Sequence, residues 1–328
     1  MTKKLSNIII ATGGTGGHVF PAYNLAKHFI NKKINVELIS DKRGLKYLNS
    51  YNDIKITEIS TSPILKENFF KFIISIIIIL HSIFRSLIFF LFNRPDFVFG
   101  MGGYSSFPVC IAAKILAIPF IIYENNLFIG KANKYLLPFT NKIFVSSEYL
   151  EGIHKKYKNK VCKIGNIIRK EIINFGENRN NNYEYNEIRI LILGGSQAAK
   201  VFAKELPEIF KKCQHNKIPL KIYQQCLPEQ NEYLKTFYKN LNIDFEVFNF
   251  SENILEYFEK VNLAITRSGS SMLAELLNAK IRKKTHMVFW GTQDSQCFGL
   301  FSMLNDSAAQ KKERSQERVV KHFFGKNI

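Results

Sequence analysis

The chain has 328 residues, of which 46% are hydrophobic and 22% are charged, enough apolar content for the cores of two domains. Its five cysteines are scattered, and no two of them form a C-x-x-C pair. This usage favours a reducing compartment and argues against a metal cluster. The first apolar run ends after four residues, so we expect no signal peptide.

The charge is strongly positive and unevenly distributed. The net charge is +19, and residues 1–164 carry 22 Lys and Arg against 9 Asp and Glu. Residues 165–279 carry 14 of each sign, and residues 280–328 carry 10 basic against 4 acidic residues. A basic first half predicts an anionic partner, although a lysine-rich coding bias accounts for part of the excess. Because no RNA-recognition motif, zinc finger or helix-turn-helix stands out, we expect no nucleic-acid partner.

The first motif is ATGGTGGHVFPA, residues 11–22. The apolar residues 8–10 predict a buried strand, and from Pro21 onward apolar residues recur at helical spacing. The four glycines between them therefore lie on a strand-to-helix turn, where a phosphate can approach backbone N–H groups. Asp41 is the nearest acidic candidate for a ribose contact. The alternative is a tight turn that binds no ligand.

Residues 69–92 form the most apolar segment of the chain. As a helix it would span roughly 36 Å, long enough to cross a bilayer. Charged residues interrupt the run, however, and charges near the bilayer centre cost several kcal/mol. We expect a helix that lies at an anionic membrane interface, with a spanning helix and an ordinary core helix as the alternatives. The expected basic rim consists of Lys66, Lys71, Arg85 and Arg94.

Two polar motifs follow predicted strands in the first half. GMGGYSSFPV, residues 100–109, supplies a second glycine turn with hydroxyl groups that include Tyr104. Glu124, Asn125 and Asn126 come directly after the predicted strand at residues 120–123. A carboxylate and two amides at the end of a strand suit the binding of sugar hydroxyls. The alternative is a capping cluster for the helix that follows.

The second half repeats the strand–glycine–helix pattern. EIRILILGGSQAAK, residues 187–200, resembles the first motif, and in TRSGSSMLAEL, residues 266–276, glycine and serine open a helix. The alternation of strand and helix patterns predicts an α/β fold with parallel sheets. Two such motifs about 180 residues apart predict two Rossmann-like halves with the ligand site in the cleft between them.

Together and in this order, GGTGGHVFPA, GMGGYSSFP, YENN, GNIIR, GGSQAA and TRSGSSMLAEL resemble the lipid II synthase family of peptidoglycan N-acetylglucosaminyltransferases. The resemblance covers residues 1–279. It implies the GT-B fold, with an acceptor- and membrane-binding domain at residues 1–164, a linker at 165–186 and a UDP-sugar-binding domain at 187–279.

The resemblance also implies an activity. N-acetylglucosamine passes with inversion from UDP-N-acetylglucosamine to lipid I, which is undecaprenyl-pyrophosphoryl-muramoyl-pentapeptide, at the cytoplasmic face of the cell membrane. No cofactor and no metal are implied. His18 is the first candidate for the general base, and Glu124 is the second.

The remaining site residues are implied by the same motifs. The loop at residues 13–17 cradles the acceptor pyrophosphate, and the acceptor residues are Gly13, Gly14 and Tyr104. The donor residues are Thr15, Gly16, Gly17, Asn126, Arg169, Ser196, Gln197, Ser251, Ser268, Gly269, Ser270, Ser271 and Glu275. Within this set, residues 268–271 form the diphosphate-binding turn and Glu275 holds the ribose.

The chain departs from the family pattern in three loops. The usual H-E-Q-N reads YENN, so Tyr123 replaces a histidine and Asn125 a glutamine. The usual G-N-P-V-R reads GNIIR, in which Ile167 replaces the proline. In GGSQAA, Ala198 replaces a glycine.

A larger departure begins near residue 280, and it leaves the activity of the chain open. We find no D-H-Q motif for the donor sugar in residues 280–328, and GTQDSQ, residues 291–296, is no convincing substitute. About 40 isoleucines precede this segment and 2 lie in it. This shift favours a change of reading frame over a divergent end. We therefore expect the C-terminal domain to be incomplete. The alternative function is an inactive remnant of the enzyme. A nicotinamide-dependent oxidoreductase is disfavoured because the glycine pattern occurs twice.

Overall fold

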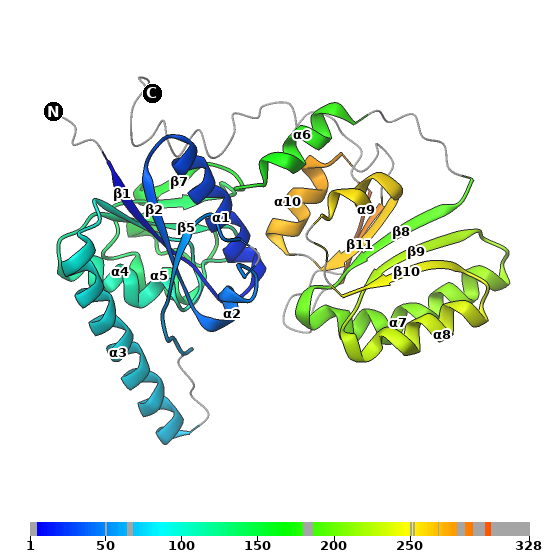
Figure 1. Cartoon of the computed structure of the whole chain (residues 1–328), viewed down its shortest axis with the longest axis horizontal. Helices are drawn as coiled ribbons and strands as arrows, with labels where there is room; N and C mark the ends of the chain where they lie inside the picture. The colour runs from blue at the N-terminus through cyan, green and yellow to red at the C-terminus, as the bar shows by residue number, and fades with distance from the viewer. Residues whose placement is uncertain are drawn as a thin grey trace. The chain divides into compact units, whose positions relative to one another are not determined.

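The computed structural model describes residues 5–49, 51–63, 68–179, 186–249, 251, 253–267, 269–280, 286–290 and 299–302 (Figure 1). Contacts divide the chain into two compact units, the first ending at Arg169 and the second beginning at Lys170. Each unit is built on its own mainly parallel sheet.

The first unit contains a sheet of seven parallel strands in the order β3-β2-β1-β4-β5-β6-β7. The strands are β1 (Asn7–Ala11), β2 (Asn35–Ser40), β3 (Lys55–Glu58), β4 (Phe97–Gly100), β5 (Phe120–Glu124), β6 (Ile143–Val145) and β7 (Val161–Lys163). Strands β1, β4 and β5 are buried on both faces, as their unbroken apolar runs predict. The strands predicted at residues 8–10 and 120–123 are confirmed.

Helices cover both faces of this sheet. Helix α1 (Gly16–Asn31) packs on one face, and α3 (Phe69–Asn93), α4 (Ser106–Ile115) and α5 (Lys131–Leu136) contribute to the core on the other. The short α2 (Lys42–Leu45) follows β2, and the 3-10 helix η1 (Lys155–Lys160) precedes β7.

Helix α1 begins earlier than the sequence predicted. We expected helical structure from Pro21, but the helix starts at Gly16, and Pro21 lies inside it. Proline has no N–H to donate to the carbonyl of Gly17, four positions before it. The side chain of Asn125 donates to that carbonyl at 2.9 Å, so the helix continues through the proline.

Helix α3 is apolar on the side that faces away from the sheet. Its buried positions include three serines, Ser75, Ser82 and Ser86, and each donates its hydroxyl to the carbonyl four residues earlier. These small side chains let α3 pack closely against its neighbours, together with Phe90, while most of its large apolar side chains remain exposed. The alternative of an ordinary core helix is therefore wrong for this segment, since only 17% of its most apolar stretch is buried.

The second unit contains a six-stranded sheet in the order β10-β9-β8-β11-β12-β13. The strands are β8 (Ile188–Leu193), β9 (Leu220–Gln225), β10 (Asp244–Phe248), β11 (Leu263–Arg267), β12 (His286–Trp290) and β13 (Gly299–Ser302). All pairs are parallel except β12–β13. The helices are α6 (Lys170–Asn178), α7 (Gly195–His215), η2 (Pro228–Gln230), α8 (Asn231–Asn240), α9 (Leu255–Lys260) and α10 (Ser270–Asn278).

The sheet extends beyond the point where the sequence departs from the family pattern. We expected the later strands to be lost after residue 279, but β12 pairs with β11, and β13 pairs with β12. The sequence HMVFW of β12 is rich in residues that favour strands, although it contains none of the family's motifs. The short helix expected at residues 315–324 lies outside the described residues, as does the GTQDSQ segment.

Gly176 tests the packing of α6 against α10. A methyl group at this position would overlap the backbone carbonyl of Asn278. Alanine is ordinarily the better helix residue by about 1 kcal/mol, but overpacking against backbone typically costs about 1–3 kcal/mol. We expect Gly176→Ala to lower the urea midpoint of unfolding. Gly269→Ser is the control, because no atom lies within 4 Å of the added carbon and serine is a good N-cap. An unchanged midpoint for Gly176→Ala would contradict this packing.

Candidate active site

The glycine motifs of the first unit meet where its strand order reverses. Strand β1 lies between β2 and β4, so the chain winds outward in opposite directions from the β1–β4 pair. Ligands of parallel α/β sheets bind outside the carboxyl ends of the strands at such a point. The loops after β1 and β4 are the two glycine motifs, residues 12–15 and 101–105.

The two loops touch through their backbones. A Cβ atom on Gly103 would lie 3.1 Å from the carbonyl oxygen of Gly13, and one on Gly13 would overlap the Ser105 hydroxyl. Gly102 and Gly103 also have φ angles of +85° and +77°, in the left-handed region that favours glycine. The second glycine motif is therefore needed for close packing against the first.

His18 lies in the first turn of α1, against these loops. Its ring atoms Cε1 and Nδ1 are 3.0 Å from where a Cβ of Gly102 would stand. The half-buried ring also hydrogen-bonds to the backbone of Met101. Burial lowers the pKa of His18 below its ordinary value, and it outweighs the Glu124 carboxylate and the Met101 hydrogen bond, which act in the opposite direction. At neutral pH the imidazole is therefore uncharged, the state in which one ring nitrogen can accept a proton.

Glu124 has a structural role at this site. Its Oε1 accepts hydrogen bonds from the backbone and side-chain nitrogens of Asn126, at 3.1 and 2.9 Å. Its Oε2 accepts from the Gly130 amide at 2.8 Å and from Asn133 Nδ2 at 3.0 Å. The carboxylate is 2% exposed, so four donors hold it in place at the start of α5. Of the two alternatives for the YENN motif, this geometry favours the capping cluster, and the carboxylate influences His18 through its charge.

Asp41 fixes the first glycine loop. Its Oδ1 accepts from the amides of Gly14 at 2.9 Å and Gly44 at 2.8 Å, and Arg43 pairs with its Oδ2 at 3.0 Å. Burial favours a higher pKa, but these hydrogen bonds and the Arg43 charge hold the pKa of Asp41 below its ordinary value. The Gly14 amide is therefore occupied by a carboxylate and does not point at the pyrophosphate expected at residues 13–17.

The other predicted residues of the first unit lie around the same edge of the sheet. Thr15 is the exposed N-cap of α1, and Gly16 and Gly17 form its first turn. Tyr104 is half-buried in the second glycine loop. The guanidinium carbon of Arg169 lies 5.8 Å from the ring centre of Phe20 in α1, an arrangement typical of a cation–π contact.

The second unit has an equivalent reversal between β8 and β11. Helix α7 begins at Gly195 directly after β8, and α10 begins at Ser270 after β11, so the two helix N-termini follow neighbouring strands. Thr266 donates its hydroxyl to the Leu193 carbonyl at 3.1 Å and joins the two strand ends. Adjacent helix N-termini concentrate backbone N–H groups where a diphosphate can bind.

Those predicted donor residues of the second unit that the structure describes lie at this edge of its sheet. Gly269 is the exposed N-cap of α10, and Ser270 and Ser271 form its first turn. Glu275 lies further along α10 and is 7% exposed, and half-buried Ser251 follows β10. Ser196 and Gln197 are in the first turn of α7, but their side chains lie outside the described part, as does Ser268.

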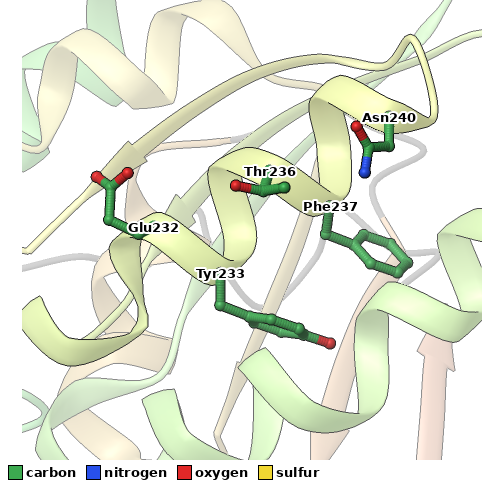
Figure 2. Close-up of a pocket in the computed structure, with 5 residues that line it drawn as sticks. All are labelled: Glu232, Tyr233, Thr236, Phe237 and Asn240. Atoms are coloured by element: carbon green, nitrogen blue, oxygen red, sulfur yellow. The ribbon is translucent and has the colours of Figure 1, made fainter.

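A separate hollow lies along one side of α8 (Figure 2). Its volume is about 470 Å³, and its lining residues are Glu232, Tyr233, Thr236, Phe237 and Asn240. None of the predicted donor or acceptor residues lines it, so it is not the candidate site. Among the residues that the structure describes, no group of three His, Cys, Asp or Glu side chains could hold a metal ion.

Comparison with known families identifies the class of protein. Residues 8–145 match the glycosyltransferase family 28 N-terminal domain, and residues 189–283 match its C-terminal domain. The chain belongs to glycosyltransferase family 28. The sequence resemblance and the expected fold of two Rossmann-like domains are thereby confirmed.

The relatives agree on one enzyme. The chain is 38% identical to a UDP-N-acetylglucosamine–N-acetylmuramyl-(pentapeptide) pyrophosphoryl-undecaprenol N-acetylglucosamine transferase of Pelagibacter ubique, over 84% of this chain and 75% of the relative. It is 32% identical to the Rickettsia felis protein of the same name, over 83% of this chain and 76% of that one.

Solved structures share the fold. Acinetobacter baumannii MurG superposes with a TM-score of 0.64 at 23% identity, covering 88% of this chain and 80% of that one. The Staphylococcus aureus MnaA–UDP structure has a TM-score of 0.56 at 15% identity, covering 86% and 80%.

The charge state of His18 can be measured directly. We expect its imidazole to titrate below pH 6.5 in an NMR titration of labelled histidine. Because the unfolded chain then binds a proton that the native state does not, this group should reduce stability as the pH falls below 6.5. Glu124→Gln should lower the pKa of His18 further, since it removes the neighbouring negative charge. A titration midpoint at or above 6.5 would contradict the buried, neutral imidazole.

Proposed function

We propose that this chain transfers N-acetylglucosamine from UDP-N-acetylglucosamine to undecaprenyl-pyrophosphoryl-muramoyl-pentapeptide. The family and the names of its relatives support the donor and the acceptor. The observation that carries the proposal is the place of His18, which directly follows the first glycine loop and whose ring lies against Gly102 and Gly103 of the second, where the strand order reverses.

His18 is the general base of this mechanism. The Met101 backbone engages the ring, which fixes its orientation and leaves the imidazole able to take a proton. The acceptor's 4-hydroxyl attacks the anomeric carbon on the face opposite UDP. The new oxygen–carbon bond forms as the bond to the UDP oxygen breaks, the hydroxyl proton passes to His18, and the electron pair leaves with UDP.

The second unit supplies the donor side of the proposed reaction. The N-termini of α7 and α10 suit the diphosphate, whose negative charge grows as UDP departs. Gly269 permits close approach because the space around it is open. Glu275 is proposed for the ribose and Arg169 for the nucleotide.

Removal of the proposed base tests the mechanism. We expect His18→Ala to lower turnover by roughly 10²–10⁴-fold with little change in UDP affinity. The assay follows radiolabel from UDP-N-acetylglucosamine into a short-chain lipid I analogue. His28→Ala is the matched control, because His28 is a half-buried histidine of the same helix, three turns from the glycine loops. Near-normal turnover for His18→Ala would show that His18 is not the general base. If the unmodified chain binds UDP but transfers no sugar, the alternative of an inactive remnant is favoured.

We also propose that α3 docks the chain on an anionic membrane surface, at the cytoplasmic face where the lipid-linked acceptor is used. Helix α3 is long and apolar enough to cross a membrane by length and composition alone. Its exposed residues Lys71 and Arg85 favour an interfacial position over a span. The exposed apolar side chains are Phe69, Phe70, Ile73, Ile74, Ile77, Leu80, Phe84, Ile88, Leu91 and Phe92.

Vesicle sedimentation tests the proposed docking. We expect binding to vesicles containing phosphatidylglycerol, and we expect added salt to weaken it. Ile77→Glu with Phe84→Glu should lower the partition coefficient at least about tenfold, because each side chain gains roughly 1.5–3 kcal/mol on burial. Ile209→Glu is the control, an exposed isoleucine in the second unit. Equal binding to neutral and anionic vesicles would contradict the proposed interface.

A further inference from the structure

We propose that Tyr123 is a positioning residue, whose buried hydroxyl clamps the segment from Gly165 to Arg169 and thereby sets the place of the Arg169 guanidinium. The inference rests on the proposed function, in which Arg169 meets the nucleotide. Tyr123 and Ile167 both depart from the family pattern, and neither has a role in the proposed mechanism.

The Tyr123 hydroxyl bridges two backbone groups of one segment. It donates to the Gly165 carbonyl at 3.2 Å and accepts from the Ile167 amide at 3.3 Å. The side chain is 2% exposed, and burial raises its pKa well above the ordinary range, so the hydroxyl stays protonated and can donate. A single oxygen therefore satisfies a donor and an acceptor two residues apart.

The clamp acts where the chain leaves the first unit. Gly165 follows β7 with a φ of +88°, and its amide donates to the Val145 carbonyl at the end of β6. Ile167 is 5% exposed and packs in the same core cluster as Tyr123. Two residues later, Arg169 stands over Phe20, and the second unit begins at the next residue.

The two departures from the family pattern are coupled in this geometry. A proline at position 167 would have no N–H to donate, whereas Ile167 donates to the hydroxyl that Tyr123 introduces. Proline stiffens a segment by fixing φ, and isoleucine does not. The Tyr123 hydroxyl supplies the lost restraint as a pair of hydrogen bonds.

The experiment measures UDP affinity by titration calorimetry for single and double variants. We expect Tyr123→Phe to weaken UDP binding about five- to tenfold, the range typical of hydrogen-bond loss. In an Arg169→Ala background the same change should have little further effect, since Tyr123 acts through Arg169. Ile167→Pro added to Tyr123→Phe should restore UDP affinity to within about twofold of the unmodified chain. The proline removes the amide that lost its acceptor, and it stiffens the segment from Gly165 to Arg169.

Tyr238→Phe is the matched control. Tyr238 is also fully buried, and its hydroxyl donates to Gln224 in the core of the second unit. We expect it to lower stability while leaving UDP affinity unchanged. Equal UDP affinities for Tyr123→Phe and Tyr238→Phe, full additivity with Arg169→Ala, or no recovery by proline would each overturn the inference.

Two readouts separate this inference from the proposed function. Hydrogen exchange of the unmodified chain should show an Ile167 amide protected like those of the strands, and rapid exchange would overturn the clamp even if Tyr123→Phe does not fold. UDP binding without transfer would count against the proposed function alone, because neither the exchange rate nor the UDP titration depends on sugar transfer.

Discussion

The backbone contact between the two glycine loops is the constraint on which the first unit's site depends. Parallel strands bring the ends of β1 and β4 to one edge of the sheet, and side chains there would force the loops apart. With a Cβ on Gly103 only 3.1 Å from the Gly13 carbonyl oxygen, the glycines allow α1 to begin directly at the contact. His18 is thereby buried enough to stay neutral, yet it remains on the edge of the sheet where ligands of this fold class bind.

Polar side chains near His18 stabilise the loops that surround it. Asn125 donates to the Gly17 carbonyl, to which Pro21 has no N–H to donate, and Asp41 accepts from the Gly14 amide. Glu124 accepts from three donors in the loop before α5 and from Asn133 within α5. Asp41 and Glu124 are poor candidates for a general base, because their carboxylates accept the hydrogen bonds that hold the loops and protonation would weaken those bonds. In the proposed mechanism the uncharged imidazole is therefore the better base, because it can change its charge without releasing a loop.

Much of this arrangement could be predicted from sequence, and the exceptions have physical causes. Strand and glycine-turn positions follow from local patterns, so β1, β5, β8 and the start of α10 were predicted correctly. The start of α1 was not, because the bond that replaces Pro21's missing donor comes from Asn125, more than a hundred residues away. The role of Glu124 was left open for the same reason. A carboxylate at a strand end can bind a substrate or cap a helix, and only the placement of its donors distinguishes the two.

The sequence alone could not predict which side of α3 faces the domain, with serines buried and most large apolar side chains exposed. Its composition allows a membrane span, an interfacial helix or a core helix, since all three are apolar. The difference lies in which residues face the domain. Serines at the packed positions donate their hydroxyls to carbonyls one turn earlier in the helix, and Ser82 also donates to the Ser60 carbonyl, so these small polar side chains are hydrogen-bonded where they are buried. Apart from Phe90, which is buried, most of the large apolar side chains are directed outward on a helix whose charged residues Lys71 and Arg85 are also exposed. This exposed apolar face is the observation behind the proposed docking at a membrane interface, a position that leaves α3 packed on the domain that holds His18.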